Sequence, residues 1–240
     1  MARVQQLVAR RYGLAQVALV LGAVDAYELL RRTISPDWPL AIAHAREIES
    51  LEQGLHIAWE APFQRAVLHV PALVDALSVF YVAASFVLTG AFFWWLYRRS
   101  LAGFRRFRNA FLAATACALA VHAAFPTAPP RLAGLGIEDT LRTLSGLQVG
   151  SVSNPVAAIP SLHAGWALGV GAGLVAYGRS RVARAAGVVY PGLVVVATVA
   201  TGNHFELDAA AGMALVALAL VVVHFFSRRG VEQSGSSPGS

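Results

Sequence analysis

Two histidines lie close to long apolar runs, in segments whose residue types suit covalent chemistry at phosphorus. The first segment spans 154–163 and ends in Pro-Ser-Leu-His163, and the second spans 201–208 and reads Thr-Gly-Asn-His204-Phe-Glu-Leu-Asp208. Asp208 follows His204 by four positions, which places both side chains on one face if a helix continues there. Two histidines and an oriented carboxylate are the minimum set for moving a phosphoryl group through a covalent phosphohistidine.

His204 and Asp208 have the spacing of a nucleophile and its orienting group. A neutral imidazole attacks phosphorus only when it is correctly aimed, and a carboxylate bonded to its other nitrogen supplies that aim. The alternative is that Asp208 only caps the last helix or pairs with an arginine. Ionisable groups at membrane depth are costly and usually functional, which favours the catalytic interpretation.

His163 follows Pro160 and Ser161, a pair that opens helices, and Ser161 is the expected N-cap. The N-terminus of that helix offers free N–H groups and a positive dipole end that suit a phosphate. In the first turn, His163 is placed to donate a proton to a leaving alkoxide. Alone it would be interpreted as an interfacial histidine without a task, but the second histidine favours the catalytic role.

Arg131 ends the segment Phe125-Pro-Thr-Ala-Pro-Pro-Arg131, whose prolines fix an extended path. A guanidinium held in this way suits bidentate phosphate binding and charge stabilisation in a transition state. The alternative is a flanking arginine whose side chain reaches the lipid head groups.

The composition requires these residues to be positioned by membrane helices. The chain has 240 residues, of which 57% are hydrophobic and 13% charged, with a mean hydropathy of +0.58. Soluble domains carry about 25% charged residues. We therefore predict an all-α, six-transmembrane-helix bundle, since a span needs about 20 residues. The apolar runs fall at about 13–30, 70–97, 109–126, 161–177, 184–201 and 207–226.

The basic residues, all arginine, cluster between the apolar runs, mainly before residue 13 and in 98–108, 179–184 and 228–229. Positive-inside counting predicts a cell-membrane protein with both termini cytoplasmic and His163 and His204 extracytoplasmic. This distribution argues against a nucleic-acid partner despite the net charge of +6. The exclusive use of arginine suggests a GC-rich bacterial genome.

We predict one domain over 1–229 and a disordered tail over 230–240. Within the domain, 31–65 is expected to be an interfacial segment with an amphipathic helix around 41–60. The histidines nearby, His44, His56 and His69, have spacings that match no compact metal site, so no metal is assigned.

Three segments together resemble the type-2 phosphatidic acid phosphatase (PAP2) superfamily, in particular its branch related to inositol phosphorylceramide synthases. They are Pro126-Thr-Ala-Pro-Pro-Arg131, Ala157-Ala-Ile-Pro-Ser-Leu-His163 and Gly202-Asn-His204-Phe-Glu-Leu-Asp208. The resemblance covers about residues 60–215. It implies six transmembrane helices, no metal or other cofactor, and catalysis by His204 as nucleophile, Asp208 as its orienting group and His163 as acid and base. Arg131, Ser161 and Asn203 are the predicted phosphate-binding residues.

The chain departs from the superfamily pattern at three positions. The motif that begins with lysine is absent, and Thr198 replaces the arginine six residues before the nucleophilic histidine. Both losses occur in the synthase-like branch, where Arg131 would contact the phosphate. Ser85 stands where that branch often has a histidine, so an auxiliary or acceptor-binding role differs here.

The predicted function is that of an integral-membrane lipid phosphatase or phosphotransferase that takes a lipid phosphate ester as substrate and has membrane lipids as surroundings. An inositol-phosphotransferase-type synthase is the alternative enzyme, and a transporter or structural membrane protein is the non-enzyme alternative. The lipid, the acceptor and the oligomeric state are not identified by the sequence. Glu60, Gln64 and Asp75 either line a head-group pocket or serve only as partners of arginines.

Overall fold

The computed structural model describes residues 37–140 and 156–235, together with Gln16. The chain divides into two compact units, Met1–Pro36 and Asp37–Ser240, and the described residues other than Gln16 belong to the second. The apolar run at 13–30, predicted as the first span, lies outside the described residues apart from Gln16.

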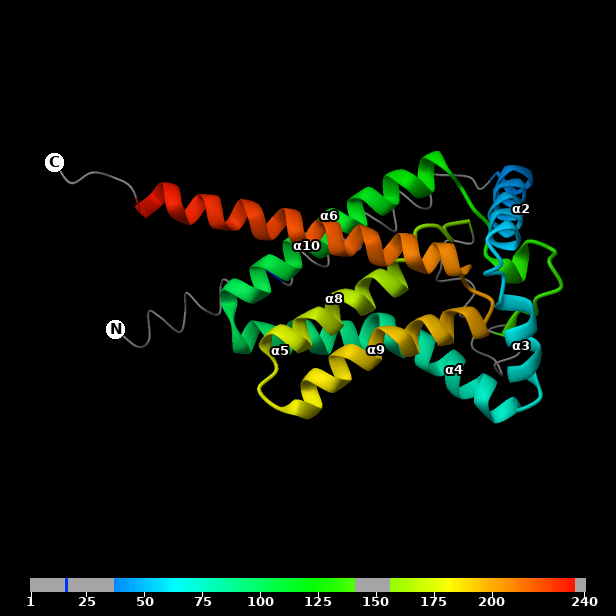
Figure 1. The fold of residues 1–240 in the computed structure, drawn as a ribbon, viewed down its shortest axis with the longest axis horizontal. Coiled ribbons are helices and arrows are strands. Elements are labelled where there is room, and N and C mark those ends of the chain that lie inside the picture. Colours follow the sequence, from blue (N-terminus) through cyan, green and yellow to red (C-terminus); the bar gives the residue numbers. More distant parts are fainter. Residues whose placement is uncertain (1–15, 17–36, 141–155, 236–240) are drawn as a thin grey trace. The chain divides into compact units, whose positions relative to one another are not determined.

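The described part is helical and contains no strand, as predicted for an all-α protein (Figure 1). Apart from helices, Thr127 and Ala157 form an isolated β-bridge. The elements in chain order are α2 (Trp38–Gly54), α3 (Glu60–Leu68), α4 (Pro71–Ala83), the π-helical turn η1 (Ala84–Leu88), α5 (Thr89–Arg99), α6 (Leu101–Ala124), the 3₁₀ turn η2 (Pro130–Leu132), α8 (Leu162–Tyr177), α9 (Arg181–Ala200) and α10 (Glu206–Gly235).

Three described helices are long and apolar enough to cross a membrane: α6, α9 and the part of α10 over Glu206–Ser227. The pair α4 and α5, bent by 41° at η1, adds a fourth span if the pair crosses as one. At 16 residues, α8 is about 24 Å long, shorter than the roughly 30 Å of a hydrocarbon core. The described residues therefore give three or four spans, and six remain a prediction.

Helix α8 lies among the other long helices and packs against α5, α6, α9 and α10. Small residues permit this, because a Cβ added to Gly165 would lie 2.6 Å from the carbonyl oxygen of Gly212 in α10. On another face, Gly171 of α8 meets Gly187 of α9 in the same close way. The helix that carries His163 is thus held on several sides by backbone contact.

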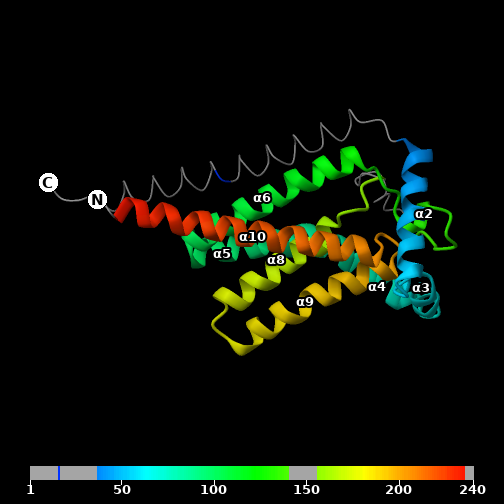
Figure 2. The same ribbon diagram turned by 45° about the horizontal axis from the view of Figure 1, so that its top comes forward.

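Helices α2 and α3 lie at one end of the long helices and run across them (Figures 1 and 2). Ala41, Ala45 and Ile48 of α2 are buried against a cluster that includes Phe205, the residue after His204. The predicted helix over 41–60 is correct up to Gly54 and wrong beyond it. There the chain turns through His56, whose φ is 60°, and a second helix, α3, begins at Glu60.

Three other boundaries differ from the sequence prediction. The run 70–97 is interrupted at η1, and α6 begins at Leu101 because the Ser100 hydroxyl accepts a hydrogen bond from the Gly103 N–H. The arginines of 98–108 therefore lie partly on helix α6. Helix α10 extends into the expected tail (230–240) as far as Gly235, and 236–240 lie outside the described residues.

Candidate active site

The turn between α9 and α10 fixes the position of His204. The Thr201 hydroxyl donates to the Ala197 carbonyl at 2.7 Å, and the Asn203 amide nitrogen donates to the Thr201 hydroxyl at 2.7 Å. Gly202 has a φ of 66°, and a Cβ there would lie 2.6 Å from the Ile137 side chain. This position therefore needs glycine for both backbone conformation and space.

The His204 ring is oriented by a backbone carbonyl as well as by Asp208. Its Nδ1 lies 3.0 Å from the Ala158 carbonyl oxygen and 3.5 Å from Asp208 Oδ2. Since a carbonyl only accepts, Nδ1 carries the proton and Nε2 holds the lone pair. Asp208 Oδ2 also accepts the Phe205 N–H at 3.0 Å. Asp208 thus caps α10 and also lies beside His204. The capping position and the orienting position, which the sequence offered as alternatives, are occupied by the same side chain.

The second histidine lies next to the first. Ser161 caps α8, as predicted, by accepting the Ala164 N–H, and His163 follows in the first turn. The ring centroids of His163 and His204 are 5.5 Å apart. On its other side His163 stacks on Tyr81 of α4, with centroids 4.3 Å apart and planes at 17°. Residues from three distant segments therefore meet at one place.

Arg131 is bonded through its backbone to the turn that carries His204. Its backbone N–H donates to the Gly202 carbonyl at 3.0 Å, and its Nε lies 3.2 Å from Asp139 Oδ1. Its Nη1 is buried and has no described hydrogen-bond partner. Burial, and then the Arg131 charge, lower the pKa of His204 to about 3, although the bond to Ala158 opposes them. His204 is therefore neutral at pH 7, the form that acts as a nucleophile.

The comparisons with known proteins decide the family. The family model of the PAP2 superfamily matches residues 46–222, a range that contains both histidines and Arg131. The chain belongs to the PAP2 superfamily. No curated protein and no solved structure matches it. Membership of the PAP2 superfamily supports phosphatase or phosphotransferase activity and, with the apolar helices, a membrane protein.

In this PAP2 protein two carboxylates from outside the three segments that carry the resemblance cap the helix that follows the candidate nucleophile. The Glu206 N–H donates to Glu60 at 3.2 Å, and the Leu207 N–H donates to Glu52 at 2.7 Å. Glu52 and Glu60 belong to α2 and α3, so these helices are fastened to the first turn of α10. Acidic groups at this position are stabilised by the positive end of the helix dipole.

The carboxylates of Glu52, Glu60 and Glu206 lie within 4.8 Å of one another, close enough in geometry to hold one metal ion. Burial raises the pKa of Glu52 far above its ordinary value. Burial acts to raise the pKa of Glu60 as well, but hydrogen bonds from Glu206 and Glu52 outweigh it and leave that pKa lowered. Glu60 is therefore the ionised member between its neighbours, and the absence of a metal stays a prediction.

The other residues of open role lie as follows. Gln64 holds the loop before Thr140 to α9, since its amide donates to the Glu138 and Ala200 carbonyls and accepts the Glu138 N–H. Asp75 is exposed on α4. The side chain of Ser85 lies outside the described residues.

Sequence reasoning missed four groups at this site: the Ala158 carbonyl, Tyr81, Asp139 and Glu52. A carbonyl has no signature in the sequence, and Glu52 is 155 positions from the N–H that it accepts. The position of Ala158 two residues before Pro160, in the quoted motif, is the one usable signal among them.

Proposed function

We propose that this protein is an integral-membrane lipid phosphatase or phosphotransferase that cleaves a lipid phosphate ester through a phosphohistidine on His204. The supporting observation is the pairing of His204 with His163 at a centroid distance of 5.5 Å, with Nδ1 of His204 bonded to Ala158 and Nε2 left for attack. The site lies at the extracytoplasmic face of the cell membrane in this proposal, with both termini cytoplasmic.

In the first step the lone pair of His204 Nε2 forms a bond to phosphorus while the bond from phosphorus to the leaving oxygen breaks. The electron pair of that bond leaves with the oxygen, and His163, which becomes protonated once the phosphate anion lies beside it, supplies the proton that completes an alcohol. Asp208 and the Ala158 carbonyl hold the ring and stabilise the charge that it gains.

In the second step an acceptor hydroxyl loses its proton to His163 and attacks the phosphohistidine. The bond between phosphorus and Nε2 breaks, its electron pair returns to His204, and both histidines regain their starting states. Water as acceptor gives a phosphatase, and an alcohol gives a transferase. Positioning and charge stabilisation carry most of the rate in such reactions.

Phosphate contact in this proposal falls to Arg131 and to the N-terminus of α8 beyond Ser161. The unpartnered Nη1 of Arg131 supports this, because a buried donor needs an acceptor. Asn203 was predicted for the same role. Its amide nitrogen donates to the carbonyl and the hydroxyl of Thr201, so its part in this proposal is to hold the turn that carries His204.

An inositol-phosphotransferase-type synthase is the second candidate. The observation that favours it is Thr198, which is fully buried and whose hydroxyl donates to the Val195 carbonyl at 2.8 Å. No phosphate contact comes from the position where the superfamily usually has arginine. This leaves Arg131 as the contact, as in the synthase-like branch that the motifs resemble.

The test uses purified protein in detergent with phosphatidic acid, undecaprenyl diphosphate and phosphatidylinositol as separate substrates. Free phosphate and new phosphodiester lipids are measured together. We expect His204→Ala to lower turnover by about 10⁴-fold or more, because the nucleophile is removed. His69→Ala, an exposed histidine at the end of α3, is the matched control and keeps full activity.

The products distinguish the two enzymes. Free phosphate that disappears in His204→Ala indicates a phosphatase, and a new phosphodiester lipid without free phosphate indicates a transferase. Equal turnover by His204→Ala and the unchanged protein would contradict the mechanism. Absence of both products with every substrate would favour the transporter or structural role instead.

A further inference from the structure

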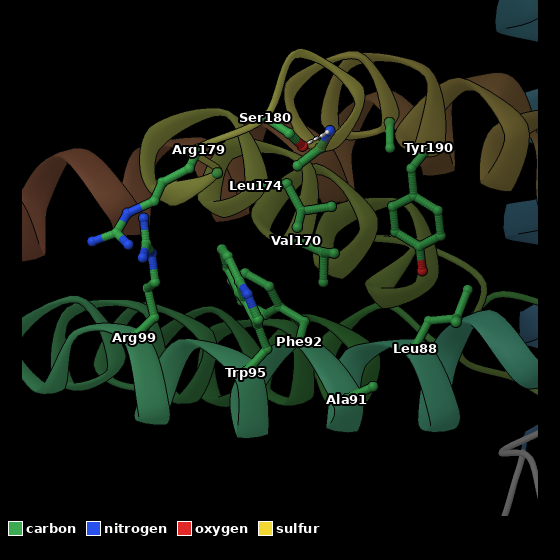
Figure 3. A pocket seen from close by; sticks show the side chains of 13 residues that line it. Leu88, Ala91, Phe92, Trp95, Arg99, Val170, Leu174, Arg179, Ser180 and Tyr190 are labelled. Carbon is green, nitrogen blue, oxygen red and sulfur yellow. Dashed lines mark hydrogen bonds between the residues drawn. The ribbon is translucent and has the colours of Figure 1, made fainter.

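A groove of about 540 Å³ lies between α5, α8 and α9, at the end of α8 opposite to His163 (Figure 3). Its walls are mostly apolar, with Phe92 and Trp95 from α5 facing Val170 and Leu174 from α8. The volume is in the range of clefts that bind small molecules. A groove between apolar helices with walls of this kind suits a hydrocarbon chain.

One end of the groove is strongly basic. Arg99 and Arg179 both line this end (Figure 3), the first as the last residue of α5 and the second from the loop before α9. Arg99 Nε donates to the Tyr177 carbonyl at 3.1 Å, which holds this guanidinium at the end of the groove. The remaining N–H groups of both arginines have no hydrogen-bond partner among the described residues and can bind an acceptor.

Neither arginine pairs with a carboxylate among the described residues. The ion pairs recorded there join Arg131 to Asp139 and His204 to Asp208, both at the other end of α8. Two like charges at one end of a groove repel each other, and an anion bound there would offset that repulsion. A phosphate is the anion that two guanidinium groups bind best, through parallel hydrogen bonds.

Two other arginines, Arg98 and Arg181, are close to these in the sequence but do not line the groove. Arg98 stacks over the Trp94 ring at 5.4 Å, and Arg181 lies in the first turn of α9; neither lines the groove. The positive-inside rule, by which arginines at the end of a span set its orientation in the membrane, is enough to explain these two residues. Arg99 and Arg179 differ because they line the apolar groove.

We propose that this groove binds an anionic glycerophospholipid, with one acyl chain along the apolar walls and the phosphate between Arg99 and Arg179. Basic pockets between membrane helices are known to hold anionic head groups. Leu88 and Arg99 are separated by eleven positions, about 16 Å of helix, so the chain would follow α5 over this length. The site is distinct from the proposed active site, because it lies at the opposite end of α8.

The test is lipid binding measured by native mass spectrometry on detergent-purified full-length protein. Phosphatidylglycerol and phosphatidylcholine with identical acyl chains are the two probes. We expect the protein to bind phosphatidylglycerol roughly 10- to 30-fold more tightly, since each arginine near the surface adds a favourable contribution to binding an anionic lipid. The variant Arg99→Gln/Arg179→Gln should bind the two lipids within about twofold of each other.

Arg98→Gln/Arg181→Gln removes the same charge from the same end and is the matched control, which should keep the preference. Ala91→Trp, which fills the apolar part of the groove, should weaken binding of both lipids by a similar factor. Equal binding of the two lipids by the unchanged protein would overturn the proposal, as would an equal loss in the control. Displacement of phosphatidylglycerol by an equal concentration of inorganic phosphate would show a free-anion site instead.

None of these measurements depends on turnover. Loss of the lipid preference in Arg99→Gln/Arg179→Gln therefore supports the groove whether or not His204 is the nucleophile. Conversely, failure of the groove would leave the proposed reaction untouched.

Discussion

The two ends of α8 solve different physical problems. At the His163 end, the donors and acceptors around His204 are mostly tied to one another through the Ala158 carbonyl, Asp208 and the turn after α9. At the other end, Arg99 and Arg179 border an apolar groove and pair with no described carboxylate. In the proposed mechanism the first arrangement holds the reacting atoms in fixed positions, and in the proposed lipid site the second leaves charge available to a ligand.

The difference shows what burial does to polar groups in a membrane bundle. His204 is 5% exposed and Asp208 fully buried. Backbone groups bond to His204 Nδ1 and to Asp208 Oδ2, which offsets part of the cost of burying them, while Asp208 Oδ1 is buried without a described partner. Arginines at a helix end reach the polar boundary and need no such network. Rigid polar networks are therefore expected where chemistry occurs, and uncommitted charge where a lipid is bound.

Among the variants that test this comparison, His163→Ala is expected to have the largest effect on activity. It should lower kcat by about 10²- to 10⁴-fold, because the leaving oxygen loses its proton donor. A substrate with a nitrophenol leaving group needs no donor, so the loss should be much smaller with it. Steady-state kinetics on both substrates checks this, and binding of phosphatidylglycerol to the opposite groove should not change. An equal loss on both substrates would contradict the acid role.

Arg131→Gln is expected to have the next largest effect, about 10²- to 10³-fold on kcat/KM, because a preorganised charge at the phosphate is removed. Asp139→Asn is the companion variant, since Asp139 only holds the Arg131 Nε. It should cost roughly tenfold or less. If Asp139→Asn were as inactive as Arg131→Gln, the role of Arg131 in phosphate contact would be wrong.

Tyr81→Leu should reduce kcat by roughly two- to tenfold, the value of one aromatic stacking contact. Tyr81 stacks on His163 and does not lie between the histidines, so its loss loosens the acid without removing it. The variant Phe80→Leu, one position earlier on α4, is the control. A kcat in Tyr81→Leu equal to that of the unchanged protein would show that the stack has no role in aiming His163.

Glu52→Gln tests the carboxyl cluster through the dependence of stability on pH. In the folded protein Glu52 keeps its proton above pH 4.5, where the unfolded chain releases it, so folding loses free energy as pH rises from there. Thermal unfolding of the unchanged protein between pH 5 and 9 should show a falling Tm. Glutamine keeps both hydrogen-bonding atoms and does not titrate, so the fall should be smaller in Glu52→Gln.

Glu49→Gln is the control for that series, since Glu49 is on the same helix and bonds only Gln53 among the described residues. It should follow the unchanged protein at every pH. Parallel Tm curves for Glu52→Gln and the unchanged protein would mean that Glu52 is ionised in the folded state.

The apolar runs predicted much of the fold, because hydrophobic length alone sets where a helix lies. The run 161–177 became α8 over Leu162–Tyr177, and 184–201 became α9 over Arg181–Ala200. The apolar runs did not predict the interruptions of the helices, because backbone geometry sets these. The π turn over Ala84–Leu88 and the turn at His56 leave no mark on the average hydropathy.

The candidate site was likewise predictable only in part. His163, His204, Asp208 and Arg131 were found from residue type and spacing, and the structure brings the two histidines into contact range. The groups that hold them came from elsewhere. A carbonyl at Ala158 and a glutamate on α2 act through long-range contacts that no local pattern records.

The most direct test of the central claim is to trap the phosphoenzyme. The protein is mixed with a lipid phosphate carrying labelled phosphorus, quenched within one turnover and digested, and the labelled peptide is identified. We predict a label that is stable in base and labile in acid, located on His204 and absent from His204→Ala. A label on any other residue, or turnover that persists in His204→Ala, would contradict the account.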